Sequence, residues 1–212
     1  MKKLFLFLFA AIAFVSCEVQ TLDEDEPYAP MAEDFINEEV DNPFGVVELN
    51  ENQARQIVED YLDGINVNFS TGELKVIESL TGLNHFRFEV YYKKVWVDGH
   101  RITLHPKRDS ETDEFSKTKL NISGTSLFYN DISVKPKLSK KEALACLKQS
   151  DSAITDKVIE SQPELLVYKR VGEAPHLAYK IRVNISTFDC WDYYVSAKTG
   201  EVVGRIYQGA VS

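Results

Sequence analysis

A capped helix followed by several short strands occurs twice along the 212-residue chain, and this repeat limits the fold more than any other feature. The first predicted helix begins after Asn50, which can cap it while Gln53 returns the second bond of a capping box. Gly64 is predicted to end this helix. Ser139 and Glu142 form a second capping box in KPKLSKKEALACLKQ, where the pattern restarts. The first helix carries an apolar stripe made of Ala54, Ile57, Val58, Tyr61 and Leu62.

Strand patterns follow each helix. HFRFEVYY (residues 85–92) alternates between apolar and mostly polar residues, and Asp98-Gly99 predicts a hairpin turn between VWV and HRITLH. A further strand is predicted from Phe115 to Ile122. After the second helix come the strand-like runs LLVYKR, HLAYKIRVNI, CWDYYVSA and EVVGRIY. We therefore expect an α+β fold of two small units, each a helix packed on an antiparallel β-sheet, with a boundary between residues 124 and 136.

The N-terminus has the pattern of an export signal. Lys2 and Lys3 precede an apolar run of twelve residues, which as a helix would span roughly 18 Å, too short for a bilayer core of about 30 Å. Residues 1–16 are therefore predicted to be a signal peptide. The sequence FVSC that ends at Cys17 resembles a bacterial lipobox, so Cys17 is expected to carry acyl chains such as palmitate. The alternative is a general signal peptide followed by an unmodified cysteine.

Acidic residues gather just after this cysteine. Residues 18–50 hold eleven Asp and Glu, and no Lys or Arg occurs between Lys3 and Arg55. We interpret residues 17–44 as a solvated tether, because like charges keep such a segment extended. The block DEDE (residues 23–26) resembles the surface-export signal of lipoproteins in Bacteroidetes. The protein is therefore expected to be exported and lipid-anchored to the bacterial outer membrane, and the sequence leaves open whether it faces the cell surface or the periplasm.

The rest of the chain has balanced charge. Removing the eleven acids from the total of 33 leaves 22, and removing Lys2 and Lys3 from the 24 Lys and Arg also leaves 22. A region with zero formal charge offers no argument for a nucleic-acid partner, and none is expected.

Two cysteines remain after Cys17 is assigned to the lipid. Cys146 and Cys190 form an even pair in a chain destined for an oxidising compartment, which makes a disulfide between them one expectation. The alternative is two separately buried thiols, since a free cysteine packs as a small hydrophobic residue.

Motifs for catalysis are missing from the sequence. The chain has no HExxH zinc helix, no CxxC pair, no Gly-rich phosphate loop and no GxSxG turn. Its four histidines, at positions 85, 100, 105 and 176, lie on strand-like segments without a ligand-spaced partner. We therefore expect no metal, no cofactor and no enzymatic activity.

Two segments resemble known domains. TGLNHFRFEVYYKKVWVDGHRITLH resembles the core of the fungalysin/thermolysin propeptide (FTP) domain, which would cover residues 45–124. LSKKEALACLKQ together with LLVYKR, HLAYKIRV and WDYYVSAKTGEVV resembles the PepSY domain, which would cover residues 136–208. The resemblance implies cystatin-like and PepSY-like units arranged as in thermolysin-family pro-regions. The first segment departs from the family pattern where Lys94-Val95-Trp96-Val97 replaces Gly-Val-Pro-Val.

The resemblance implies a function without catalysis. Such a stand-alone propeptide-like lipoprotein would bind a secreted or surface thermolysin-family metallopeptidase and inhibit it or assist its folding. The candidate peptidase contacts are Trp96, His100, Arg101, Arg205 and Tyr207. Two alternatives remain: a non-enzymatic cell-envelope binding module with no peptidase partner, and a truncated peptidase precursor.

Overall fold

The computed structural model describes residues 35–79, 82–125, 127, 131–170 and 173–209. The predicted signal peptide and Cys17 lie outside these residues, as does most of the predicted tether. The last part of the predicted tether range is structured, because strand β1 (Phe35–Asp41) pairs with another strand there.

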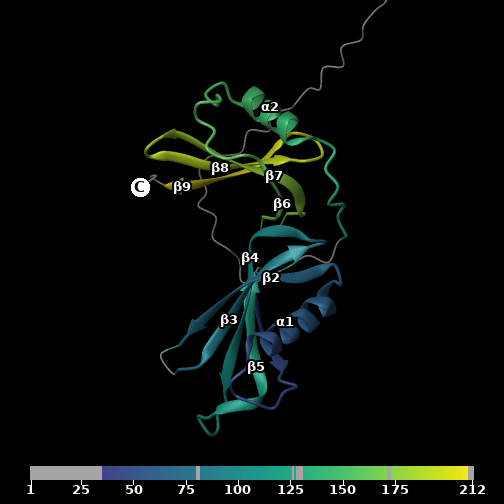
Figure 1. The fold of residues 1–212 in the computed structure, drawn as a ribbon, viewed down its shortest axis with the longest axis vertical. Helices are drawn as coiled ribbons and strands as arrows, with labels where there is room; N and C mark the ends of the chain where they lie inside the picture. The colour runs from purple at the N-terminus through teal and green to yellow at the C-terminus, as the bar shows by residue number, and fades with distance from the viewer. Residues whose placement is uncertain (1–34, 80–81, 126, 128–130, 171–172, 210–212) are drawn as a thin grey trace, which may run out of the picture.

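Two helices and nine strands make up the described chain (Figure 1). After β1 the first half contains α1 (Glu51–Ile65), β2 (Phe69–Glu78), β3 (Asn84–Tyr92), β4 (Val95–Arg108) and β5 (Phe115–Thr125). The second half contains α2 (Lys140–Ser150), β6 (Glu164–Tyr168), β7 (His176–Ser186), β8 (Asp189–Ser196) and β9 (Val202–Gly209). The four strands predicted after the second helix are therefore confirmed.

Both predicted capping boxes are present. The Asn50 side chain accepts a hydrogen bond of 3.0 Å from the Gln53 backbone N–H, and the Gln53 side chain accepts one from the Asn50 N–H. Ser139 and Glu142 make the same reciprocal pair at the start of α2. These bonds satisfy N–H groups that have no partner within the helix.

The strands form one mixed, curled sheet rather than two separate sheets. Its order is β1-β5-β4-β6-β7-β8-β9, with β3 also pairing with β4 and β2 pairing with β3. The halves are joined where β4 runs parallel to β6, with Val97 opposite Val167. The prediction of two small helix-on-sheet units is therefore wrong. Capping and alternation report local structure, whereas the pairing of Val97 with Val167 is non-local and buries both side chains completely.

The turn between β3 and β4 also differs from the prediction. Lys93 and Lys94 form this turn with positive φ angles of 46° and 66°, and Tyr92 pairs with Val95 across it. Two positive φ angles match the turn that best follows the twist of a two-residue hairpin. Asp98 and Gly99 lie inside β4, where the register shifts and Gly99 has a φ of 74°. The Asp-Gly pair therefore forms part of a bulge and not the hairpin turn.

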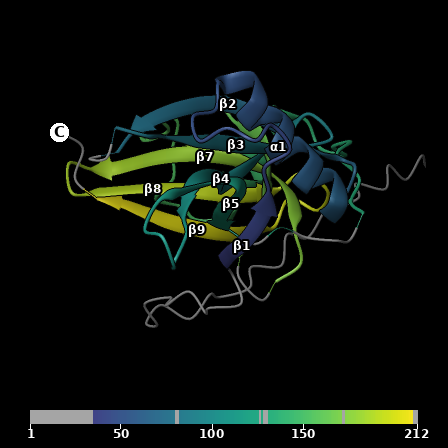
Figure 2. The ribbon, with the colours of Figure 1, turned by 90° about the horizontal axis from the view of Figure 1, so that it is seen from below.

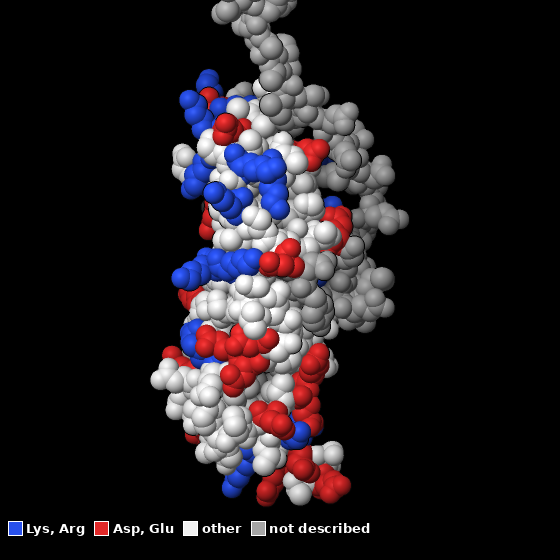
Figure 3. All heavy atoms as spheres, turned by 90° about the vertical axis from the view of Figure 1, so that its right-hand side faces the viewer, with Lys and Arg blue, Asp and Glu red and all other residues white. Residues whose placement is uncertain are grey.

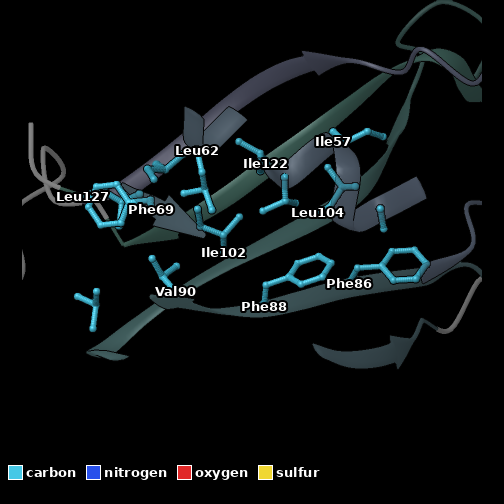
Figure 4. Packing of buried hydrophobic residues seen from close by; sticks show 14 of the residues in the cluster. Ile57, Leu62, Phe69, Phe86, Phe88, Val90, Ile102, Leu104, Ile122 and Leu127 are labelled. Atoms are coloured by element: carbon cyan, nitrogen blue, oxygen red, sulfur yellow. The ribbon is translucent and has the colours of Figure 1, made fainter. Parts of the chain in front are cut away.

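Each half has a helix over one face of its strands. In the first half, α1 covers the inward residues of β3, β4 and β5, and Figure 4 shows Ile57 at the end of the cluster that holds Phe86 and Phe88, with Leu62 near Phe69. In the second half, Ala143 and Leu147 of α2 are fully buried against β7 and β8. Figure 2 shows β7, β8 and β9 lying side by side across the molecule. Among the described residues, no helix combines the length and apolarity needed to cross a bilayer.

Candidate partner-binding site

The end of the sheet near the label C in Figure 1 carries a group of exposed apolar side chains. Phe188 is 74% exposed in the turn between β7 and β8, and Tyr207 of β9 is 52% exposed. The register places Tyr207 opposite Trp191 and Arg205 opposite Tyr193, which brings β9 beside this turn. We define the aromatic patch as the exposed Ile185, Phe188 and Tyr207 together with the half-buried Trp191 and Arg205.

Contacts within the aromatic patch hold its shape. The Trp191 and Tyr207 rings lie 5.1 Å apart, and the Arg205 guanidinium lies 4.9 Å above the Trp191 ring. Tyr207 donates a hydrogen bond of 2.6 Å from its hydroxyl to the Phe188 backbone oxygen. Trp191 donates its indole N–H to the Asp189 carboxylate. A preorganised surface of this kind loses less side-chain entropy when a partner binds.

Strand β9 lies at the end of the sheet order. It pairs with β8 on one side, and no other strand of the described chain pairs with its second side. Alternate residues of such an edge strand direct backbone N–H and C=O groups outward, where another chain can pair with them. The aromatic patch therefore stands next to an open hydrogen-bonding edge.

The structure separates the five predicted contact residues. Arg205 and Tyr207 lie in the aromatic patch, but the other three lie on β4 in the middle of the sheet. Trp96 is half-buried beside Tyr194 and Tyr168, and Lys180 sits 5.5 Å above its ring. His100 is only 4% exposed, so it does not offer the predicted surface contact. Its Nδ1 lies 3.0 Å from the backbone oxygen of Asp98, two residues earlier in the same strand.

Arg101 is exposed on a different face. It lies opposite Glu89 of β3 and helps to line a shallow polar groove with Glu73, Lys75 and Arg87. The predicted contact surface around Trp96 and the tail therefore does not form one continuous site in the structure.

A network of charged residues lies where β4 meets the second half. Arg182 donates to both carboxylate oxygens of Asp192, at 2.8 and 3.0 Å. Lys180 lies 3.3 Å from Asp192 and 3.3 Å from Asp98. Tyr194 donates its hydroxyl to Asp98, and its ring stacks on Tyr168 with centroids 3.9 Å apart. This ionic network ties the bulge of β4 to β7 and β8.

The environment shifts the pKa values of this network. Burial acts to raise the pKa of Asp192, but the hydrogen bond from Arg182 and the charge of Lys180 outweigh it, so the pKa lies below its ordinary value. The pKa of Arg182 is raised by its hydrogen bond to Asp192. Burial raises the pKa of Tyr194, and the bond to Asp98 raises it further. Asp192 and Arg182 therefore remain charged at neutral pH, with Tyr194 protonated.

A histidine pair was missed by the sequence analysis. His85 of β3 and His105 of β4 meet with their Nδ1 atoms 2.6 Å apart, and the His105 Nε2 lies 2.6 Å from the Ser123 hydroxyl of β5. Burial lowers the pKa of His105, and the charges of His85 and Arg87 act in the same direction. Phe86 lies opposite Leu104, which places His85 opposite His105. A sequence prediction with this register of β3 against β4 would have found the pair. Among the described residues, no group of three or more His, Cys, Asp or Glu side chains is placed to hold a metal ion.

Cys146 and Cys190 are both free thiols in the structure. Cys190 is buried in β8 opposite Gly209, while Cys146 of α2 faces the turn at Gly200. The structure corresponds to the second of the two expectations, separate thiols, because the helix residue and the strand residue lie against different parts of the second half. Burial raises the pKa of the Cys190 thiol, which keeps it protonated and unreactive.

Charge is unevenly distributed over the surface. Figure 3 shows the side of the molecule that is on the right in Figure 1. Lys and Arg side chains gather over the upper part of this side, and Asp and Glu predominate over its lower part. The lower part belongs to the first half, where α1 carries Glu51, Glu59, Asp60 and Asp63.

Comparisons with known proteins provide little guidance. No family model matches the sequence, and no curated protein matches it. Among solved structures, the C-terminal domain of Bacillus megaterium YpeB shows a weak structural similarity, with 16% identity and a TM-score of 0.34. The match covers 76% of this chain and 66% of that chain. Nothing about function follows from a similarity of this size.

Proposed function

We propose that the protein is a non-enzymatic binding module that pairs its β9 edge with an extended segment of a partner protein. The observation that carries this proposal is the open edge of β9 beside the exposed aromatic patch. In strand addition, main-chain hydrogen bonds supply affinity and alternate side chains enter pockets that supply specificity. Trp191, Tyr207 and Arg205 belong to the residue types that contribute most at binding surfaces.

The proposed partner is a secreted or surface thermolysin-family metallopeptidase, which the module inhibits or helps to fold. Support comes from the resemblance of the sequence to FTP and PepSY domains, because pro-regions of this type lay extended chain near the peptidase cleft. A cleft edge is itself an extended backbone, so it has the chemistry that β9 can pair with.

The site of action is proposed to be the outer surface of the cell envelope. The lipobox-like sequence supports acylation of Cys17, and the acidic segment after it supports a solvated tether that holds the folded part away from the lipid. An exported peptidase would reach the module in that compartment.

The test uses the mature chain with Cys17→Ser and the thermolysin-family peptidases of the source organism. We expect binding with a Kd of about 1 μM, together with inhibition or improved recovery of denatured peptidase. Tyr207→Ala should weaken binding about tenfold, since it removes a large patch side chain and its hold on the Phe188 turn. Phe35→Ala is the matched control, because Phe35 is 53% exposed on β1, a different edge strand of the same sheet.

Two outcomes would contradict the proposal. Absence of binding, inhibition and assisted refolding with every such peptidase at micromolar concentration would leave the envelope binding module as the better account. Equal effects of Tyr207→Ala and Phe35→Ala would reject the aromatic patch as the contact surface.

A further inference from the structure

The His85–His105 pair is a cross-strand pair on the face of the first half that α1 does not cover. Phe86 pairs with Leu104 and both point into the core, so the residues just beyond them oppose each other on the other face. The two rings lie 4.9 Å apart in an edge-to-face arrangement, with Nδ1 facing Nδ1 at 2.6 Å. Both side chains are half-buried and therefore reachable from solvent.

The short contact constrains what lies between the two nitrogens. Two neutral imidazole lone pairs cannot face each other at this distance, so one proton must lie between them. The Ser123 hydroxyl on the far side of His105 lets its Nε2–H donate a hydrogen bond, which leaves the Nδ1 of His105 with a lone pair. A hydrogen bond on the far nitrogen is the usual way in which a protein orients a metal-binding histidine.

We propose that this pair binds one divalent transition metal ion of tetragonal preference, Cu²⁺ or Ni²⁺, through the two Nδ1 atoms. The ion takes the place of the shared proton, which moves through solvent to the Nε2 of His85, so both imidazoles stay neutral and no net proton is released, and water completes the coordination. Imidazole nitrogen is a preferred ligand for both ions, and Cu²⁺ is the stronger binder of the two.

Geometry favours these ions over tetrahedral Zn²⁺. With metal–nitrogen bonds of about 2.0 Å, two ligands at neighbouring square-planar positions lie roughly 2.8 Å apart, whereas tetrahedral ligands lie roughly 3.3 Å apart. The present separation of 2.6 Å is closer to the square-planar value, so the rings need to part less.

Neighbouring charge limits the affinity of the site. Arg87 lies on the same face two residues along β3, opposite Thr103, and its positive charge repels a bound cation. The nearest acidic residue on that face of β3 is Glu89, which lies opposite Arg101 in the strand register. Removal of the Arg87 charge should therefore strengthen metal binding, an effect that a merely structural histidine pair would not produce.

The experiment uses the mature chain with Cys17→Ser and no histidine tag. Ni²⁺ titration by calorimetry should show one ion per chain, and electron paramagnetic resonance with one equivalent of Cu²⁺ should show a tetragonal spectrum with coupling to two nitrogens. His85→Asn and His105→Asn should each weaken binding at least tenfold, and Ser123→Ala about tenfold. Arg87→Gln should tighten binding several-fold.

His176→Asn is the matched control, because His176 is a half-buried histidine on β7, away from the pair. Binding that is unchanged in His85→Asn, or reduced equally by His176→Asn, would overturn the proposal, as would no binding of either ion at 100 micromolar. If the histidine variants fail to fold, Arg87→Gln decides the question in the otherwise intact chain, since unchanged or weaker binding would contradict the proposed site.

Discussion

At the scale of single residues, Asp192 is a buried carboxylate that depends on positively charged partners. It is 1% exposed and faces both Arg182 and Lys180. A buried carboxylate is tolerated only when its partners replace the hydration that it loses. Both of its partners remain partly exposed, at 42% and 20%, so solvent screens part of the interaction.

Asp192→Asn should lower the free energy of unfolding by about 2 kcal/mol, because it removes the charge while both cations stay in place. Urea denaturation at pH 7 measures this difference. Asp113→Asn is the control: Asp113 pairs with Arg108 on the surface and is 86% exposed, so its loss should change stability by no more than about 0.5 kcal/mol. Equal effects of the two substitutions would contradict the role given to the ionic network.

The same residue predicts a pH dependence. The pKa of Asp192 is lower in the folded protein than its ordinary value of about 3.9, so its contribution to stability is present above that pH. The contribution is lost as the pH falls through the folded pKa. The stability difference between the wild type and Asp192→Asn should therefore narrow below about pH 4 and stay constant from pH 5 to pH 7.

At the scale of secondary-structure elements, the turn between β8 and β9 depends on a glycine. Gly200 has a φ of 83°, and a Cβ atom there would lie 2.6 Å from the Cys146 sulfur of α2. Gly64 in α1 has no atom within 4 Å of such a position and no positive φ. Alanine is therefore expected to destabilise the protein at position 200 and to stabilise it at position 64.

Gly200→Ala should destabilise the protein by about 2 kcal/mol, through backbone strain and the clash with Cys146. Gly64→Ala should stabilise it by about 0.5 kcal/mol, since alanine favours the helix and restricts the unfolded chain. Thermal unfolding of both variants measures the shifts. A stabilised Gly200→Ala would show that the turn does not need its left-handed conformation.

Elements were predictable from sequence where the signal is local. The capping boxes at Asn50 and Ser139 located both helices, and period-two alternation located the strand over residues 85–92. The turn at Lys93-Lys94 was not predictable in this way, because lysine is rarely selected for positive φ, whereas Asp98-Gly99 carries a strong turn signal. This error hid both the inward position of His100 and the meeting of His85 with His105.

At the scale of the whole molecule, the pairing of Val97 with Val167 could not be read from either half. Each residue lies in an apolar stretch that would suit an antiparallel sheet in its own half equally well. The ionic network around Lys180 was equally hidden, since Asp98 and Lys180 are distant in sequence and meet only after the halves join.

The anchor is a whole-molecule prediction about residues beyond the described range. If Cys17 is acylated, Cys17→Ser should abolish labelling by radioactive palmitate and leave the precursor with its signal peptide. Continued palmitate labelling of Cys17→Ser would contradict the anchor, and Cys190→Ser serves as a control cysteine because Cys190 is buried.

The parallel pair between β4 and β6 also bears on how the chain folds. Val97 and Val167 are about 70 residues apart, so bringing them together closes a long loop. The chain loses conformational entropy in closing this loop before the contact contributes any stabilisation. The β3–β4 and β7–β8 hairpins close far shorter loops and can form first. Docking of the two halves is then the late step of folding, and a chain interrupted before it would leave Val97 and Val167 on open edges that invite aggregation.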